Sequence, residues 1–257
     1  MTKIVQITDP HLGPDKEYRL AGIQTISSFE VVLEDALEHA PDLLLITGDI
    51  VADPDPAAYR YFFAAMEATG VPMVWLPGNH DDAKMAESVI NSTRYEKSHD
   101  VGNWRLLLLD SMVPGTPNGC LGDDELVFFE KAMAENTQDH LLICLHHHPI
   151  KVGSDWIDQQ LVADSEKFLQ IVESTDRVRM VVWGHVHQVV EQMRGDVFFA
   201  SAPSTCIQFK SNSRNFALSD EQPGYRIIEL FDDGRVETQV QRVEVPQFEV
   251  ALESEGY

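Results

Sequence analysis

The segment KIVQITDPHL, residues 3–12, leads from an apolar stretch directly into two potential metal ligands, Asp9 and His11. The apolar part has the length and the composition of a strand that is buried on both faces of a sheet. The two polar side chains therefore follow the point where a buried strand becomes a loop. This junction predicts a functional site at one edge of a sheet.

Four further apolar runs end in the same way. PDLLLIT is followed by Gly48-Asp49, VPMVWLP by GNHD at 78–81, HLLICL by HHHP at 146–149, and VRMVVW by GHVH at 184–187. Loops at one edge of a sheet can converge on a single point. Aspartate, asparagine and histidine side chains at such a point provide oxygen and imidazole donors and no thiolates, a donor set that binds divalent metals.

Helical patterns alternate with these strand-like runs in the first two thirds of the chain. They are predicted at 23–40, 57–69, 123–135 and 163–176. We therefore predict the α/β fold class.

The pattern changes after Gly184. Strand-like runs follow at 196–203, 224–231 and 235–245, with the turn signal Asp-Asp-Gly at 232–234. This predicts an antiparallel, β-rich C-terminal third. Because the ligand motifs must meet, we predict a single domain over 1–257, with a loosely held acidic tail at about 248–257.

Composition limits the partners. The formal net charge is −23, from 19 basic and 42 acidic residues, which argues against nucleic acid and against an anionic membrane surface. A small anionic substrate remains compatible, because bound cations reverse the local potential.

The three cysteines are scattered and fit a reducing compartment, and no apolar run reaches the roughly 20 residues of a membrane span. The chain starts without the pattern of a signal peptide, so we expect a cytoplasmic protein. The sequence carries no signal for an oligomeric state.

The spacing of the ligand residues suits two metals. Asp9 and His11 are two residues apart, so in an extended segment their side chains point to the same side, and His185 and His187 repeat this spacing. The two oxygens of Asp49 can bridge two cations. Two metals about 3.5–4 Å apart catalyse displacement at phosphorus, because they activate a bridging water and hold the phosphoryl oxygens.

His80 is the candidate for proton transfer. It lies between the ligand Asn79 and the acidic Asp81. A carboxylate beside an imidazole can orient it and keep it protonated. We therefore predict His80 and Asp81 as catalytic residues, with His80 assisting the phosphate or the leaving oxygen.

The motif order D-x-H, G-D, G-N-H-D, H-x-P and G-H-x-H resembles the calcineurin-like metallophosphoesterase superfamily. Longer segments also resemble the bacterial class III cyclic nucleotide phosphodiesterases, which act on 3′,5′-cyclic AMP. These segments are QITDPHLG, WLPGNHD, LHHHP, GHVHQ, SAPSTCIQF at 201–209 and the final SEGY. The resemblance runs from residue 4 to residue 257, with no departure at a ligand position.

The resemblance implies a four-layer αββα sandwich with two iron or manganese cations at its sheet edge. The implied ligands are Asp9, His11 and His187 for one metal, Asn79, His185 and one histidine of 146–148 for the other, and Asp49 as the bridge. The expected histidine is His147, two residues before Pro149, with His146 as the alternative. The expected substrate contacts are His11, Asp49, Asn79, His80 and His187.

The activity implied by the resemblance is hydrolysis of 3′,5′-cyclic AMP to 5′-AMP. A metal-bridging hydroxide would attack phosphorus opposite the 3′-oxygen. Because the motifs alone fit any phosphoester, a broad-specificity phosphodiesterase or phosphomonoesterase is the alternative. A non-catalytic metal-binding scaffold is the alternative from a different class, since members of large folds lose activity.

Other polar side chains have simpler interpretations. His148, like whichever of His146 and His147 is not the ligand, fits a packing role or a role behind the ligands. His99 and His140 show no pattern and are expected at the surface. Cys206 could be a nucleophile, but packing is favoured because no His–Asp motif accompanies it.

Overall fold

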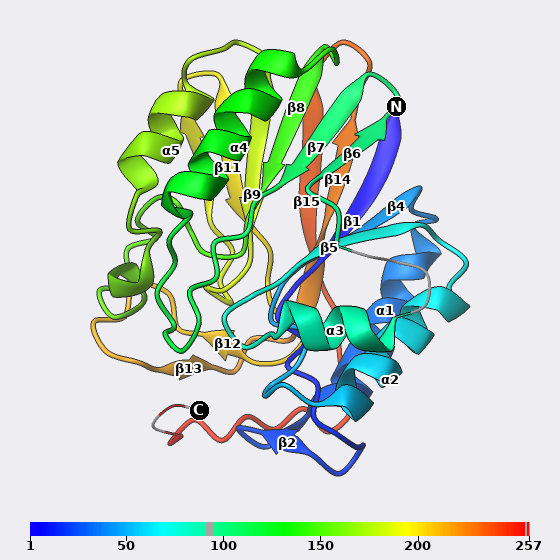
Figure 1. The fold of residues 1–257 in the computed structure, drawn as a ribbon. Helices are drawn as coiled ribbons and strands as arrows, with labels where there is room; N and C mark the ends of the chain where they lie inside the picture. The colour runs from blue at the N-terminus through cyan, green and yellow to red at the C-terminus, as the bar shows by residue number, and fades with distance from the viewer. Residues whose placement is uncertain (91–94, 255, 257) are drawn as a thin grey trace.

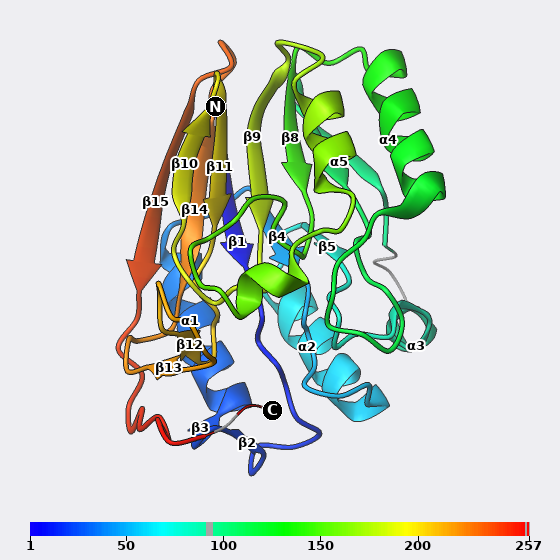
Figure 2. The same cartoon turned by 90° about the vertical axis from the view of Figure 1, so that its left-hand side faces the viewer.

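Two β-sheets lie face to face in the computed structural model, which describes residues 1–90, 95–254 and 256. Helices cover the outer face of each sheet, so that the chain forms four layers (Figures 1 and 2). The predicted αββα architecture is confirmed.

The first sheet contains five of the predicted strands. Its order is β15 (Val236–Arg242), β14 (Gly224–Leu230), β1 (Thr2–Ile7), β4 (Leu43–Thr47) and β5 (Met73–Leu76). Strands β1, β4 and β5 run parallel, while β14 pairs antiparallel with β1. The predicted hairpin at 232–234 joins β14 to β15.

The second sheet has a parallel centre and antiparallel edges. Its order is β10 (Glu191–Arg194), β11 (Val197–Ser201), β9 (Val178–Trp183), β8 (His140–Cys144), β7 (Trp104–Leu108) and β6 (Ser98–Val101). Strands β11, β9, β8 and β7 run parallel. The carboxyl ends of parallel strands lie at one edge of a sheet, so the motif loops after β8 and β9 share an edge of this sheet, and those after β1, β4 and β5 share an edge of the first sheet.

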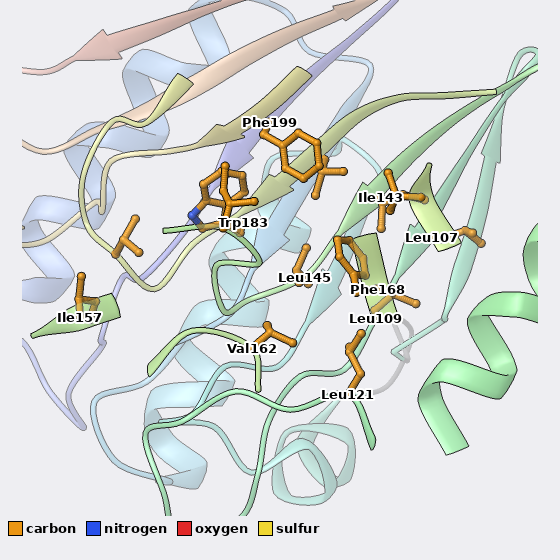
Figure 3. Close-up of a cluster of buried hydrophobic side chains, with 14 of the residues drawn as sticks. Leu107, Leu109, Leu121, Ile143, Leu145, Ile157, Val162, Phe168, Trp183 and Phe199 are labelled. Atoms are coloured by element: carbon orange, nitrogen blue, oxygen red, sulfur yellow. The ribbon is translucent and has the colours of Figure 1, made fainter. Parts of the chain in front are cut away.

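Burial on both faces explains the continuous apolar runs. Alternate residues of a strand point to opposite faces. In β8, Leu142 packs between the two sheets, whereas Leu141 and Ile143 pack toward the helices. Figure 3 shows Ile143 in this outer cluster, together with Phe168 and Phe199.

Each helix lies over one sheet. On the first sheet are α1 (Thr25–Glu38), α2 (Pro56–Ala68) and the short α3 (Ala83–Val89); on the second are α4 (Gly122–Glu135) and α5 (Ser165–Val172). Four helices were predicted, and α3 was not. Helix α2 begins where the Asp55 carboxylate accepts from the amides of Ala57 and Ala58, with proline in the first turn.

Short elements complete the chain near the site. They are β2 (Arg19–Leu20), β3 (Ile23–Gln24), the 3₁₀ helix η1 (Ile157–Gln160), β12 (Gln208–Phe209) and β13 (Leu218–Ser219).

The segment around Ala251 lies beside the β2–β3 hairpin (Figure 1). The Ala251 amide donates to the Ala21 carbonyl at 2.8 Å, and Phe248 and Val250 pack against the outer cluster of the second sheet. Loose attachment of the acidic tail stays a prediction, and residues 255 and 257 lie outside the described part of the chain.

The surface position expected for His140 is wrong. This side chain is buried, and its ring lies 5.0 Å from that of Trp104. The cause is its place at the start of the buried strand β8. In the ranges described, no helix has both the length and the apolar character that a membrane crossing needs.

Candidate metal centre

The loops after β1, β4, β5, β8 and β9 bring the predicted ligand residues together. Three sets of buried donor atoms each lie within 4.8 Å of one another: Asp9, His11 and His187; His146, His147 and His185; and Asp9, Asp49 and His146. A fourth set joins His11, Asp49 and the half-buried His80 within the same distance. Residues separated by up to 178 positions thus form one polar centre inside an apolar fold.

Asp49 lies between the other donors. Its Oδ2 is 3.2 Å from His146 Nε2 and 3.7 Å from His11 Nε2. Its Oδ1 accepts a hydrogen bond from the His80 amide at 2.9 Å. One carboxylate oxygen is therefore fixed by the backbone, and the other faces histidines from two different donor sets.

Hydrogen bonds from neighbouring groups fix the side chains of the donor set around Asp9. The Asp9 carboxylate accepts from the His185 amide at 3.0 Å and from the Thr8 hydroxyl at 2.6 Å. His187 Nδ1 donates to the Ile207 carbonyl at 2.9 Å, so the Nε2 lone pair of the neutral ring points to the site. This Nε2 lies 3.2 Å from His11 Nε2 and 3.5 Å from Asp9 Oδ1.

The histidine run gives its first two members different surroundings. His146 Nδ1 donates to the Thr47 carbonyl at 2.7 Å, and His146 Nε2 lies 3.1 Å from Asn79 Oδ1. His147 Nδ1 lies 2.8 Å from the Ser111 hydroxyl. His146 therefore faces Asn79 and Asp49, whereas His147 joins only the set with His146 and His185.

The donor atoms fit cations. With its Nδ1 proton on Thr47, His146 points Nε2 at two oxygen acceptors, so this position holds either a proton or a cation in its place. Acceptor atoms approach one another this closely around a positive charge. In addition, Nε2 of His147 and Nε2 of His185 are buried and have no hydrogen-bond partner among the described residues. Unsatisfied buried nitrogens are rare unless a ligand completes them.

The protein environment sets the charge of these rings. Burial lowers the pKa of His11, His147 and His185 well below the ordinary value, which favours the neutral form that binds metals. Burial also opposes protonation of His146, but the Asp49 carboxylate outweighs it and raises the pKa of His146 to about 9. A positive charge is thus most favoured beside Asp49.

Backbone strain gathers at the same residues. Among the described residues other than glycine, nine have a positive φ, and five of them are Asp9, His11, Asp49, His185 and His187. Left-handed conformations cost energy and persist where they serve a site. The extended geometry expected for Asp9-x-His11 and His185-x-His187 is therefore wrong. Asp9 and His11 join one donor set, whereas His185 and His187 contribute to two different sets.

His80 and Asp81 have separate partners. His80 Nδ1 donates to the Ala52 carbonyl at 2.7 Å, so Ala52 orients the ring that Asp81 was expected to orient. The Asp81 carboxylate accepts from the amides of Ile50 and Gly78 and from the Tyr59 hydroxyl at 3.0 Å. Asp81 therefore ties the Asp49 loop to the Asn79 loop. A catalytic role for Asp81 stays a prediction.

The model of the family described as calcineurin-like phosphoesterase matches residues 2–189. The chain belongs to the calcineurin-like phosphoesterase family. All the proposed ligand residues lie inside the matched range, which confirms the predicted superfamily.

Two curated relatives match this calcineurin-like phosphoesterase over nearly its whole length. The 3′,5′-cyclic adenosine monophosphate phosphodiesterase CpdA of Vibrio vulnificus is 40% identical, over 99% of this chain and 95% of that protein. The protein of the same name from Pseudomonas aeruginosa is 37% identical, over 99% of this chain and 94% of its own length. The similarity therefore includes the C-terminal third, beyond the family match.

Solved structures share the fold at low sequence identity. A purple acid phosphatase from yellow lupin superposes with a TM-score of 0.71 at 14% identity, over 97% of this chain and 52% of that one. A dimetal phosphatase from Danio rerio gives a TM-score of 0.63 at 14% identity, over 95% of this chain and 99% of that one.

The remaining histidine and the cysteine of the motifs lie behind the site. His148 is buried, with Nε2 3.6 Å from the Asp158 carboxylate and its ring stacked on that of His185. Cys206 is fully buried, and burial raises the pKa of its thiol to about 12. A thiol that stays protonated is a poor nucleophile, which supports the packing interpretation.

Close backbone approach makes Gly48 necessary, and this gives a first prediction. Its φ is +92°, and an added Cβ would lie 2.7 Å from the Gly78 nitrogen and 2.5 Å from His146 Nδ1. Gly70 has a φ of +68° but open space around it. Gly70→Ala should cost about 1–2 kcal/mol of unfolding free energy from backbone strain alone. Gly48→Ala should cost about 1–3 kcal/mol more from overpacking.

Urea unfolding of both glycine variants in chelator measures this difference without a metal contribution. Equal losses of unfolding free energy in Gly48→Ala and Gly70→Ala would mean that the loops of Gly48 and Gly78 are not in close contact.

Proposed function

We propose that this protein hydrolyses 3′,5′-cyclic AMP to 5′-AMP with two divalent cations. The position of Asp49 between two sets of histidine donors carries the reaction class. The substrate rests on the near-full-length similarity to cyclic AMP phosphodiesterases. The phosphatase-like sandwich is compatible with other phosphoesters, so the substrate is the part that most needs a direct test.

One cation would be held by Asp9, His11 and His187, and the other by Asn79, His146 and His185, with Asp49 shared. When bound, two such cations supply Lewis acidity toward the phosphoryl oxygens and a nucleophile derived from water. Carboxylate, amide and imidazole donors without thiolate suit manganese and iron, which we propose as the metals.

The protein's own groups would then orient the substrate. Asp49, Asn79 and His80 line one side of a cavity of about 250 Å³. With Nδ1–H of His80 on the Ala52 carbonyl, Nε2 is the ring atom that would carry a proton to the phosphate or the departing 3′-oxygen. The same residues, with His11 and His187, are the proposed substrate contacts.

The net charge of the chain bears on its proposed partners. A net charge of −23 disfavours nucleic acid as a partner, whereas a small anion would be drawn to the cations. A cytoplasmic location stays a prediction, and no membrane partner is proposed.

The histidine ligand can be identified by substitution, and this is a second prediction. His146→Ala should lose one metal per chain, because His146 faces Asn79 and Asp49. His147→Ala should retain more metal, since its ring lies farther from the shared carboxylate. Metal-to-protein ratios of the purified variants measure this, with His148→Ala as the matched control. Metal loss in His147→Ala alone would favour the register in which His147 is the ligand.

A product assay tests the function. Purified protein loaded with manganese or iron should convert cyclic AMP to 5′-AMP, and a chelator should abolish this conversion. Comparable kcat/KM values for cyclic AMP, p-nitrophenyl phosphate and bis-p-nitrophenyl phosphate would instead favour a broad phosphoesterase. Two bound metals without turnover of any of these would favour the scaffold alternative.

A further inference from the structure

Three aromatic rings line a cavity beside the metal centre. The cavity of about 250 Å³ that is lined by Asp49 and His80 is also lined by Trp156, Phe209 and Phe216. These rings come from residues just before η1, from β12 and from the segment between β12 and β13, which lie at the same end of the molecule as the chain end (Figures 1 and 2). We call these three residues the aromatic wall.

Phe209 connects the aromatic wall to the metal centre. Its ring stacks on that of His187, with centroids 4.2 Å apart and an interplanar angle of 3°. Trp156 and Phe216 each meet Phe209 edge to face, at 5.0 Å and 5.6 Å. The aromatic wall therefore begins in direct contact with the proposed metal ligand His187 and continues along the cavity.

The outer two rings are incompletely buried. Phe209 is 4% exposed, whereas Trp156 and Phe216 are half-buried at the edge of the outer cluster. A ring that only filled the core would be enclosed on all sides. Half-buried rings that line a cavity beside a polar centre are typical of ligand sites, where apolar walls accompany a few convergent polar groups.

Gln160 adds a polar group to this cavity. It ends η1, where its backbone carbonyl accepts from the Gly119 amide at 3.3 Å. Among the described residues, its side-chain amide has no hydrogen-bond partner that would tie it to the protein. An amide offers both a donor and an acceptor, the complement of the adjacent acceptor and amino group on adenine.

We propose that the aromatic wall binds the base of the nucleotide by stacking and that Gln160 recognises its polar edge. This proposal rests on the proposed function, because phosphate at the metal centre places the base within the same cavity. Stacking on a neutral base also suits a chain whose strong negative charge would repel further anionic groups.

The origin of the wall agrees with a role in substrate choice. Phe209 and Phe216 lie beyond residue 189, where the match to the whole family ends. The cyclic AMP phosphodiesterases that resemble this chain cover 99% of it and so include this region. The proposed metal ligands thus lie in the part shared by the family, whereas two of the four proposed base contacts, Phe209 and Phe216, lie outside it.

Substitution of Trp156 tests the stacking. Trp156→Ala should raise KM for cyclic AMP roughly 5- to 150-fold, the scale of one lost base–aromatic stack, with kcat changed far less. Trp156→Phe should recover most of the affinity, which separates stacking from a folding defect. Val127→Ala, an exposed apolar residue of α4 away from the cavity, is the matched control and should leave KM unchanged.

A substrate without a base separates this inference from the proposed function. The cyclic ribose 3′,5′-phosphate that lacks the base should be a poor substrate of the wild type and should lose nothing further in Trp156→Ala. If the wild type cleaves neither substrate, the proposed function fails. If it cleaves both with equal kcat/KM, or if Trp156→Ala affects both equally, the base subsite is wrong while the phosphodiesterase activity stands.

Gln160→Glu tests the edge contact. A carboxylate only accepts hydrogen bonds, so it should pair with the N1–H and amino group of guanine and repel the ring nitrogens of adenine. The ratio of kcat/KM for cyclic AMP to that for cyclic GMP should fall roughly 5- to 150-fold. An unchanged ratio, with both activities intact, would overturn the role of Gln160.

Discussion

Asp49→Ala should lose its metals and its activity together. The variant removes the carboxylate that faces both His11 and His146, and it leaves the remaining donors without the charge they share. The fall in kcat for cyclic AMP should exceed the roughly 10²–10³-fold that the loss of one electrostatic stabiliser costs. Metal analysis and turnover of the same preparation measure both effects.

The matched control for this variant is Asp42→Ala. Asp42 lies just before β4 and Asp49 shortly after it, so the two aspartates flank opposite ends of one strand. The Asp42 carboxylate accepts from the Lys3 amide and is distant from the metal centre. Asp42→Ala should keep both metals and near-normal turnover. Two bound metals and near-normal turnover in Asp49→Ala would contradict the proposal that Asp49 is shared by both metals.

His80→Ala should separate chemistry from metal binding. The ring is positioned by its Nδ1 bond to Ala52, and its loss leaves both proposed ligand sets complete. We expect two metals per chain and a fall in kcat for cyclic AMP on the order of 10²–10⁴, the usual scale of general acid–base help.

The leaving group decides what His80 does. A ribose 3′-oxygen needs a proton as it departs, whereas an aryl oxide does not. The loss in His80→Ala should therefore be much smaller for bis-p-nitrophenyl phosphate than for cyclic AMP. Equal losses for both substrates would assign His80 to positioning the phosphate, and the acid role would be withdrawn.

The fold was predictable because strands that are buried on both faces have continuous apolar sequences. Runs such as HLLICL and VRMVVW place apolar side chains both toward the other sheet and toward the helices. The site was predictable for the same reason, since polar residues directly after parallel buried strands gather at the carboxyl edge of each sheet. Short elements with few buried residues, such as α3, leave too weak a pattern.

Local geometry was not predictable in the same way. Three adjacent histidines give no register, and only the contacts with Asn79 and Asp49 distinguish His146. Aspartate and histidine adopt the left-handed backbone more often than most residues, but residue type alone does not single out Asp9 and His11. The aromatic wall combines rings from distant segments that carry no motif. Asp81 accepts hydrogen bonds from the amides of Ile50 and Gly78, whose positions are set only when the loops fold.

Two metals that share Asp49 can be seen by anomalous diffraction from crystals grown with manganese. We expect two peaks in the buried centre, one beside His187 and one beside His146, each within coordinating distance of the Asp49 carboxylate. A single peak, or a pair of which only one member contacts Asp49, would contradict this arrangement.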